Sequence, residues 1–199
     1  MSDVEALSHC MLIWRSFTHW IGGMGVLVFI LCLLPLTGGY HMNLMKAESP
    51  GPSVSKLVPK VQSTAKILYT IYIILTIVEI IFLLIGKMPL FDTLCLSFGT
   101  AGTGGFGIKN DSIASYSTYN QVVITVFMIL FGINFNAYYL LLTKKVMQAA
   151  KNEEVRYYLG IIGLAIVAIA INTREMFTSF GRAFQQAAFQ VGSIITTTG

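Results

Sequence analysis

Long apolar segments constrain this chain more than any other feature of its sequence. The segment 11–34 contains one charged residue, Arg15; the segment 67–85 contains one, Glu79; and the segment 121–142 contains none. An α-helix needs roughly 20 apolar residues to cross about 30 Å of hydrocarbon, so each segment is long enough to span a membrane. Only 11% of the residues are charged, whereas a soluble domain has about 25%. The sequence therefore predicts an all-α membrane protein.

A fourth apolar segment, 157–171, spans a membrane only if flanking residues join it or the bilayer thins locally. Four transmembrane helices are thus expected. Eight of the 13 basic residues lie in the segments 38–66 and 143–156, and four lie on the other side of the spans. The positive-inside rule makes those two segments cytoplasmic and places the start of the chain outside. A nucleic-acid-binding patch is a poor alternative, because the lysines are dispersed between spans.

A short apolar segment, 89–100, precedes the glycine-rich sequence AGTGGFG at 101–107. Twelve helical residues extend only about 18 Å, so this segment is too short to cross and is predicted to be a re-entrant pore helix. Four glycines in seven residues do not form a stable helix. Polar residues 109–112 follow, which indicates that the chain returns to the outer surface.

Irregular backbone at membrane depth persists only where it is buried in protein or lines water. Glycine lets backbone carbonyls turn toward one axis, and rings of carbonyl oxygens can replace the hydration shell of K⁺. The segment 101–107 is therefore interpreted as a pore loop. The alternative is a glycine-rich external turn that touches no ion.

The same order of elements recurs near the end of the sequence. The span 157–171 is followed by an amphipathic stretch, 180–195, and then by Thr196-Thr197-Thr198-Gly199. Pairing Thr103-Gly104 with Thr198-Gly199 gives a repeat of 95 residues, and internal repeats are common in transport proteins. The predicted organisation is 1–36 as the second helix of repeat 1, 37–65 as a cytoplasmic loop, 66–143 as repeat 2 with helix, pore loop and helix, 144–156 as a second cytoplasmic loop, and 157–199 as the start of repeat 3.

Several short motifs occur in a specific order along the chain. They are Trp14-Arg15-Ser16 with Trp20 to Gly25, Lys46-Ala47-Glu48 with Pro50-Gly51-Pro52, Leu90-Phe91-Asp92 with Thr103 to Phe106, Gly132 to Phe135, and Phe189 to Val191 with Ser193 to Gly199. Each motif alone is modest, but their order and spacing are specific. On these motifs the chain resembles the TrkH-type membrane subunit of bacterial Trk/Ktr potassium-uptake systems, over nearly all of its 199 residues.

The resemblance implies K⁺ transport through one pore surrounded by four helix–pore–helix repeats of a single polypeptide. It implies a multi-pass protein of the bacterial inner (plasma) membrane, usually a homodimer, with a cytoplasmic regulatory subunit that binds nucleotide. Membrane lipid and the remainder of the polypeptide are further expected partners, and nucleic acid is not. No cofactor is expected beyond the transported K⁺. No enzymatic activity is expected, because the sequence has no nucleophile–base pair, metal-ligand set or phosphate loop.

The resemblance also implies a selectivity filter built from two pore loops. Its predicted residues are Thr103, Gly104, Gly105, Phe106, Thr196, Thr197, Thr198 and Gly199. The resemblance places Gly104 and Gly199 at the filter glycine position, and glycine at that position goes with K⁺ selectivity in the family. Gly102 departs from the family, which more often has Ser or a β-branched residue there. The first filter, the helix after the third filter and the fourth repeat are not in the sequence. The alternative function is therefore a non-conducting membrane fragment with a structural or assembly role.

Three polar residues are predicted to support the filter. Arg15 pairs with Glu79 or with pore-loop carbonyls, or it snorkels to the outer surface. Asp92 caps the pore helix or attracts cations to the mouth of the pore. Asn134, together with Asn136, lines the ion path or steadies the pore loop, or it forms interhelical hydrogen bonds around a close glycine contact.

Overall fold

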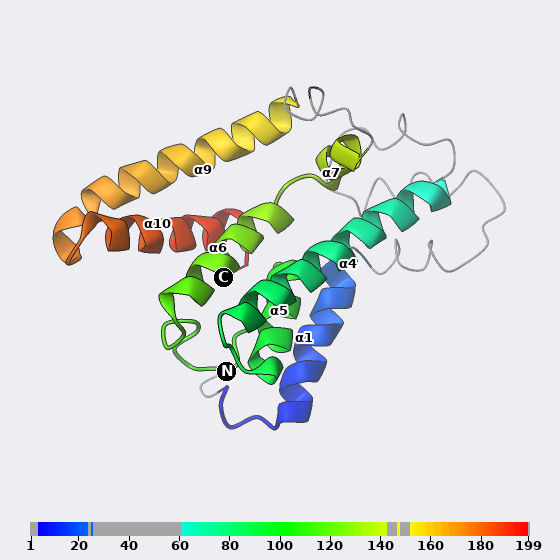
Figure 1. Ribbon diagram of the computed structural model, residues 1–199, viewed down its shortest axis with the longest axis horizontal. Helices are drawn as coiled ribbons and strands as arrows, with labels where there is room; N and C mark the ends of the chain where they lie inside the picture. Colours follow the sequence, from blue (N-terminus) through cyan, green and yellow to red (C-terminus); the bar gives the residue numbers. More distant parts are fainter. Residues whose placement is uncertain (1–3, 24, 26–60, 143–146, 148–151, 199) are drawn as a thin grey trace.

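The computed structural model describes residues 4–23, 25, 61–142, 147 and 152–198, with only the backbone described at 61–64 and 136. Within these ranges the chain is helical and contains no strand (Figure 1). The elements are α1 (His9–Gly23), α4 (Val61–Ile85), α5 (Leu90–Ala101), α6 (Thr118–Phe131), α7 (Phe135–Leu142), α9 (Glu153–Asn172), the short 3₁₀ helix η2 (Arg174–Met176) and α10 (Phe180–Ile195). The all-α prediction is confirmed.

Two of the described helices are long and apolar enough to cross a membrane, by length and composition: Ala65–Ile85 within α4, and α9. The fourth predicted span, 157–171, is marginal at 15 residues. In the structure it is part of α9, which begins four residues earlier, at Glu153. There the Asn152 side chain caps the helix by accepting the Glu154 N–H at 3.1 Å. The rest of the first predicted span after Gly25, and most of both predicted cytoplasmic loops, lie outside the described residues.

The short helix α5 lies in the centre of one half of the molecule, where it packs against α1, α4 and α6 (Figure 1). Pro89 occupies its N-cap, with φ −53° and ψ 142°, as suits a residue that lacks an N–H. The polar side chains of Thr93, Ser97 and Thr100 on this helix are buried. Because protein surrounds α5 on several sides, the irregular backbone at its end does not need to face lipid.

The third predicted span is not one continuous helix. Within the predicted span 121–142, α6 ends at Phe131 and α7 begins at Phe135. A Cβ at Gly132 would collide with the hydroxyl oxygen of Tyr158 from α9, so glycine is what lets the two elements approach this closely.

Two tyrosine hydroxyls satisfy carbonyls at this break. The Ile133 N–H donates to Leu130 O at 3.1 Å and not to Ile129 O. The Tyr158 hydroxyl donates to Ile129 O at 3.1 Å, and the Tyr138 hydroxyl donates to Leu130 O at 2.7 Å. A helix interruption in an apolar region is stable only when the freed backbone groups find such partners.

The helices α9 and α10 form an antiparallel pair that also contacts α6 through α10 (Figure 1). The Ser179 side chain caps α10 by accepting the Arg182 N–H at 3.3 Å. Their shared apolar core consists of Ile162, Ile166, Ala170, Ala187 and Val191. The order of a long helix, a short connection and a shorter helix thus occurs twice, in α4 with α5 and in α9 with α10.

Candidate pore loops

The first pore loop, defined as residues 102–107, begins where α5 ends. Gly102 caps the helix with φ −75° and ψ −3°, and its N–H donates to Phe98 O at 3.0 Å. Thr103 then adopts a left-handed φ of 56°, and Gly105 has a φ of 55°. The Gly104 N–H returns to Gly99 O at 2.9 Å. This is a helix C-terminus closed by a left-handed residue, which redirects the chain away from the helix axis.

The second pore loop, defined as residues 196–198, follows the same backbone path at the end of α10. Thr196 caps the helix with φ −86° and ψ 0°, and Thr197 has a left-handed φ of 56°. The Thr198 N–H donates to Ser193 O at 2.9 Å. Gly199 lies outside the described residues.

The two loops fix the register of the repeat. The caps Gly102 and Thr196 are 94 positions apart, and so are the left-handed residues Thr103 and Thr197. The pairing of Thr103-Gly104 with Thr198-Gly199, at 95 positions, is therefore displaced by one residue. Backbone conformation pairs Gly104 with Thr198, which makes Gly105 the sequence counterpart of Gly199.

Arg15 on α1 binds the far end of the first pore loop. Its Nη2 donates to Gly107 O at 2.6 Å, and its guanidinium carbon lies 5.1 Å from the centre of the Phe106 ring. Pairing with a pore-loop carbonyl was one of the predicted alternatives for Arg15. The pair with Glu79 does not form in the described part of the chain, where Glu79 is fully buried in α4.

His19, one helical turn after Arg15, binds the near end of the same loop. Its Nε2 lies 2.8 Å from Gly102 O. Because a carbonyl only accepts, this nitrogen must carry the proton and donate it. The ring also meets Phe106 edge-on, with centroids 4.9 Å apart and planes at 90°. Sequence reasoning missed His19, since a lone histidine without metal-ligand spacing carries no motif. Its four-residue spacing from Arg15 was the available signal, because such residues share a helix face.

The second pore loop is held by its own side chains. The Thr196 hydroxyl donates to Gly192 O at 2.7 Å and lies 2.7 Å from the Thr198 hydroxyl. Both threonine side chains are buried. These side-chain hydrogen bonds join residues at most four positions apart, so the side chains support this loop end locally.

The structure brings the two pore loops to one small cavity of about 20 Å³. Gly105 and Phe106 of the first loop and Thr198 of the second line it, together with Phe189 of α10 and Met128 of α6. Three of the predicted filter residues, Gly105, Phe106 and Thr198, thus line the same cavity. The C-terminal ends of α5 and α10, which carry partial negative charge, point into these loops.

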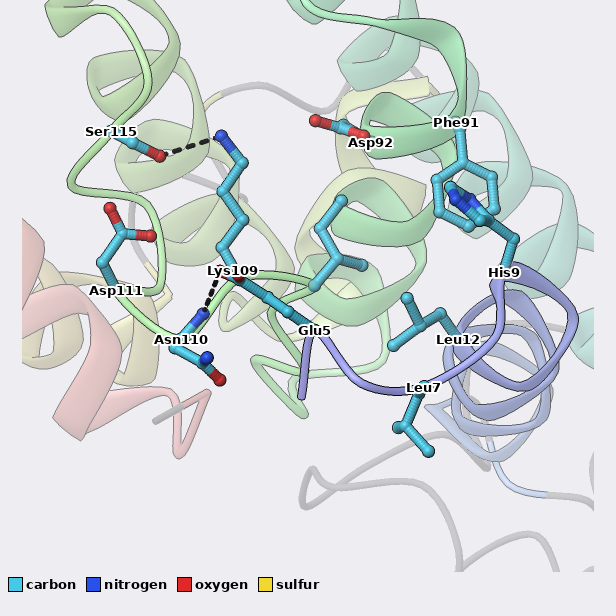
Figure 2. Close-up of a pocket in the computed structure, with 11 residues that line it drawn as sticks. Glu5, Leu7, His9, Leu12, Phe91, Asp92, Lys109, Asn110, Asp111 and Ser115 are labelled. Carbon is cyan, nitrogen blue, oxygen red and sulfur yellow. Dashed lines mark hydrogen bonds between the residues drawn. The ribbon is translucent and has the colours of Figure 1, made fainter. Parts of the chain in front are cut away.

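Asp92 lies away from the pore loops, in a pocket of about 590 Å³ that Glu5, His9 and Asp111 also line (Figure 2). Its carboxylate accepts the Tyr116 hydroxyl at 2.8 Å. Asp92 lies in the first turn of α5, where its negative charge suits the partial positive charge of the helix start, and Pro89 at the N-cap makes no side-chain hydrogen bond. Burial, followed by this hydrogen bond and the negative charge of Asp92, raises the pKa of Tyr116.

Asn134 lies at the break between α6 and α7. Its amide nitrogen donates to a carboxylate oxygen of Glu154, in the first turn of α9, at 2.9 Å. This is an interhelical hydrogen bond close to Gly132, which is one of the two interpretations made for Asn134. The side chain of Asn136 lies outside the described residues.

The sequence of the chain matches a known protein family. The model of the TrkH family, described as cation transport protein, matches residues 1–164 of the chain. The chain belongs to the TrkH family. Family membership confirms the resemblance predicted from the motifs.

Individual TrkH relatives match almost the whole chain. The Trk system potassium uptake protein TrkH of Salmonella typhimurium is 31% identical over 98% of the chain, and that of Vibrio parahaemolyticus is 34% identical over 98%. The chain spans 42% of the length of each. The crystal structure of the potassium transporter TrkH from Vibrio parahaemolyticus matches with a TM-score of 0.78 and 28% identity, over 98% of this chain and 40% of that one. The chain is thus a multi-pass protein of the bacterial inner membrane, as predicted.

Proposed function

We propose that the chain contributes two pore loops to the K⁺-translocating pathway of a Trk-type uptake system. The observation that carries this proposal is the pair of loops with one backbone conformation, which border a common cavity at the C-terminal ends of α5 and α10. A helix C-terminus favours a cation. The relatives named as potassium uptake proteins supply the identity of the ion.

The proposed filter consists of Thr103, Gly104, Gly105 and Phe106 together with Thr196, Thr197, Thr198 and Gly199. Their backbone carbonyls would replace the water shell of K⁺. Within this proposal, Gly105 is the glycine on which K⁺ selectivity depends most. It corresponds to Gly199 in the register of the two loops and has a left-handed φ of 55°. A side chain at Gly105 would therefore strain the backbone at the point where carbonyl direction counts.

The supporting residues take three different roles in this proposal. Arg15 holds the end of the first pore loop, Asp92 attracts cations to the outer pocket, and Asn134 ties the broken helix after the first loop to α9. The rest of the pore would come from further repeats of the polypeptide. A homodimer and a cytoplasmic nucleotide-binding subunit are the proposed partners.

The test is K⁺ uptake by the complete gene product in a bacterial host that lacks its own K⁺ uptake. Gly105→Ser is expected to lower the preference for K⁺ over Na⁺ by roughly tenfold, since about 1.4 kcal/mol of filter strain corresponds to that factor. Gly181→Ser is the matched control, because a Cβ at Gly181 meets nothing within 4 Å. If the unaltered protein gave no K⁺ uptake, the proposal would fail and a structural or assembly role would be favoured.

A further inference from the structure

The first pore loop contains two glycines where the second has threonines. Gly102 corresponds to Thr196 and Gly104 corresponds to Thr198. Gly104 has no left-handed φ, so its backbone conformation does not require glycine. The reason for glycine must therefore lie in the space around it.

The imidazole ring of His19 occupies that space. A Cβ at Gly104 would collide with the ring, with three ring atoms within 2.8 Å, and a Cβ at Gly102 would lie 2.5 Å from His19 Cδ2. The ring is fixed on two sides, by the hydrogen bond from Nε2 to Gly102 O at 2.8 Å and by its edge-on contact with Phe106. It cannot simply move aside for a side chain at position 104.

The second loop fills the same positions with its own atoms. There the Thr196 and Thr198 hydroxyls bond to each other at 2.7 Å, and Thr196 also bonds to Gly192 O. One loop thus carries its polar support in its own side chains, and the other receives both volume and a hydrogen-bond donor from α1. The two arrangements of side chains support the same backbone conformation in the two loops.

We propose that His19 is a positioning residue of the filter, which replaces for the first pore loop the two threonine side chains that support the second. It holds Gly102 O by donation from Nε2 and holds Phe106 by ring contact, so that the carbonyls between them keep their direction. This proposal rests on the proposed function as a K⁺ pathway. It predicts that selectivity depends on the donor at position 19 and that positions 19 and 104 are coupled.

The first experiment compares His19→Ala and His19→Gln in the complete gene product, with K⁺ uptake measured under Na⁺ competition. His19→Ala is expected to lower the preference for K⁺ over Na⁺ by roughly two- to tenfold, the range that one lost hydrogen bond supplies. His19→Gln keeps an N–H donor on a side chain of similar reach and is expected to stay within about twofold of the unaltered protein. Thr18→Ala is the matched control, since Thr18 is exposed on the same helix and its hydroxyl donates to carbonyls of α1 itself, Trp14 O and Arg15 O.

The second experiment is a double-variant cycle between positions 19 and 104. Gly104→Thr alone is expected to impair uptake and lower the unfolding temperature of the detergent-extracted protein, because the new side chain meets the ring of His19. In the His19→Ala background the same change is expected to be harmless or to restore selectivity, because it recreates the side chain of Thr198 in the vacated space. If one single variant reaches the membrane poorly and its uptake cannot be compared, the coupling between the two positions is still obtained from the unfolding temperatures.

The outcomes separate this proposal from the proposed function. An unaltered protein without K⁺ uptake would remove the proposed function, whereas uptake that responds to Gly105→Ser but not to His19→Ala would remove only the role of His19. Equal losses in His19→Ala and His19→Gln, or additive effects of the changes at 19 and 104, would also overturn it, because residues in direct contact are expected to be non-additive.

Discussion

The two pore loops follow one backbone path with two kinds of support. Thr103 and Thr197 share a φ of 56°, and each lies directly after the cap of a short helix. The first loop is held by Arg15 and His19, which are 92 and 83 residues from the carbonyls they bind. The second is held by the hydroxyl of Thr196, which bonds four residues back.

This difference teaches that a conformation can be common to two loops while its stability has different sources. The first loop receives its side-chain support from α1, which packs against α5, and its glycines leave room for that contact. The second carries its polar support within its own sequence. We therefore expect changes in α1 to affect the first loop and leave the second intact.

The largest effect is expected from Arg15→Gln. The guanidinium makes a charged hydrogen bond to Gly107 O at 2.6 Å, and such a bond contributes about 1.5–3 kcal/mol. We expect K⁺ uptake to fall by more than about tenfold, since about 1.4 kcal/mol corresponds to that factor. The measurement is K⁺ uptake by the complete gene product, normalised to its abundance in the membrane.

Arg182→Gln provides the control for loss of charge, because Arg182 is exposed in the first turn of α10. If Arg15→Gln transported K⁺ as well as Arg182→Gln does, support of the first loop from α1 would be disproved.

An intermediate effect is expected from Thr196→Val. This change keeps the shape of the side chain and removes the hydroxyl that bonds to Gly192 O and Thr198. We expect the free energy of unfolding to fall by about 1 kcal/mol or somewhat more, because Gly192 O accepts in a buried position. Thermal unfolding of the purified protein in detergent measures this.

Thr173→Val is the matched control for Thr196→Val. Its hydroxyl makes the same kind of bond four residues back, to Ile169 O at 2.8 Å, but on an exposed helix end. The combination of Arg15→Gln with Thr196→Val is expected to be additive, since the two loops are supported separately. Strong coupling between these two changes would show that the supports are shared.

The smallest effect is expected from Thr103→Gly and Thr197→Gly. A left-handed φ destabilises the folded state of a non-glycine residue by about 1–2 kcal/mol. Glycine removes this strain, but it loses more backbone entropy on folding, which offsets part of the gain. Each variant is thus expected to unfold at a slightly higher temperature, because its free energy of unfolding rises by up to about 1 kcal/mol. The two variants are expected to gain similar amounts of stability. If one variant were more stable than the unaltered protein and the other less stable, the two loops would not be equivalent in conformation.

Much of the fold could be predicted from the sequence. Apolar length alone predicted the helical membrane class, because a span must be long and uncharged. The shortness of the segment before AGTGGFG predicted α5 almost to the residue, with Pro89 at its start. Four glycines in seven residues predicted that the helix would stop. The division of the chain into repeats and the list of filter residues stay predictions.

Less of the candidate site could be predicted. The sequence left Arg15 with three alternatives, and for His19 it offered only the four-residue spacing from Arg15. It also predicted one span where Gly132 separates α6 from α7, because apolar content does not reveal where Tyr158 from another helix replaces a helical hydrogen bond. The register of the two loops was misjudged by one residue, since the letters Thr-Gly match at 95 positions and the backbone matches at 94.

By itself, then, the sequence determined the helical membrane class, the end of α5 at the glycine-rich segment 101–107, and the family to which the chain belongs. These properties depend on composition and spacing within one segment. Tertiary structure alone decided which carbonyl Arg15 binds and what fills the space beside Gly104, and backbone conformation decided which glycine corresponds to Gly199 in the register of the repeat. The first two depend on contacts between residues some 80–90 positions apart in the chain, which no local pattern predicts. The third depends on the backbone conformation of each loop, which the matching letters Thr-Gly do not reveal.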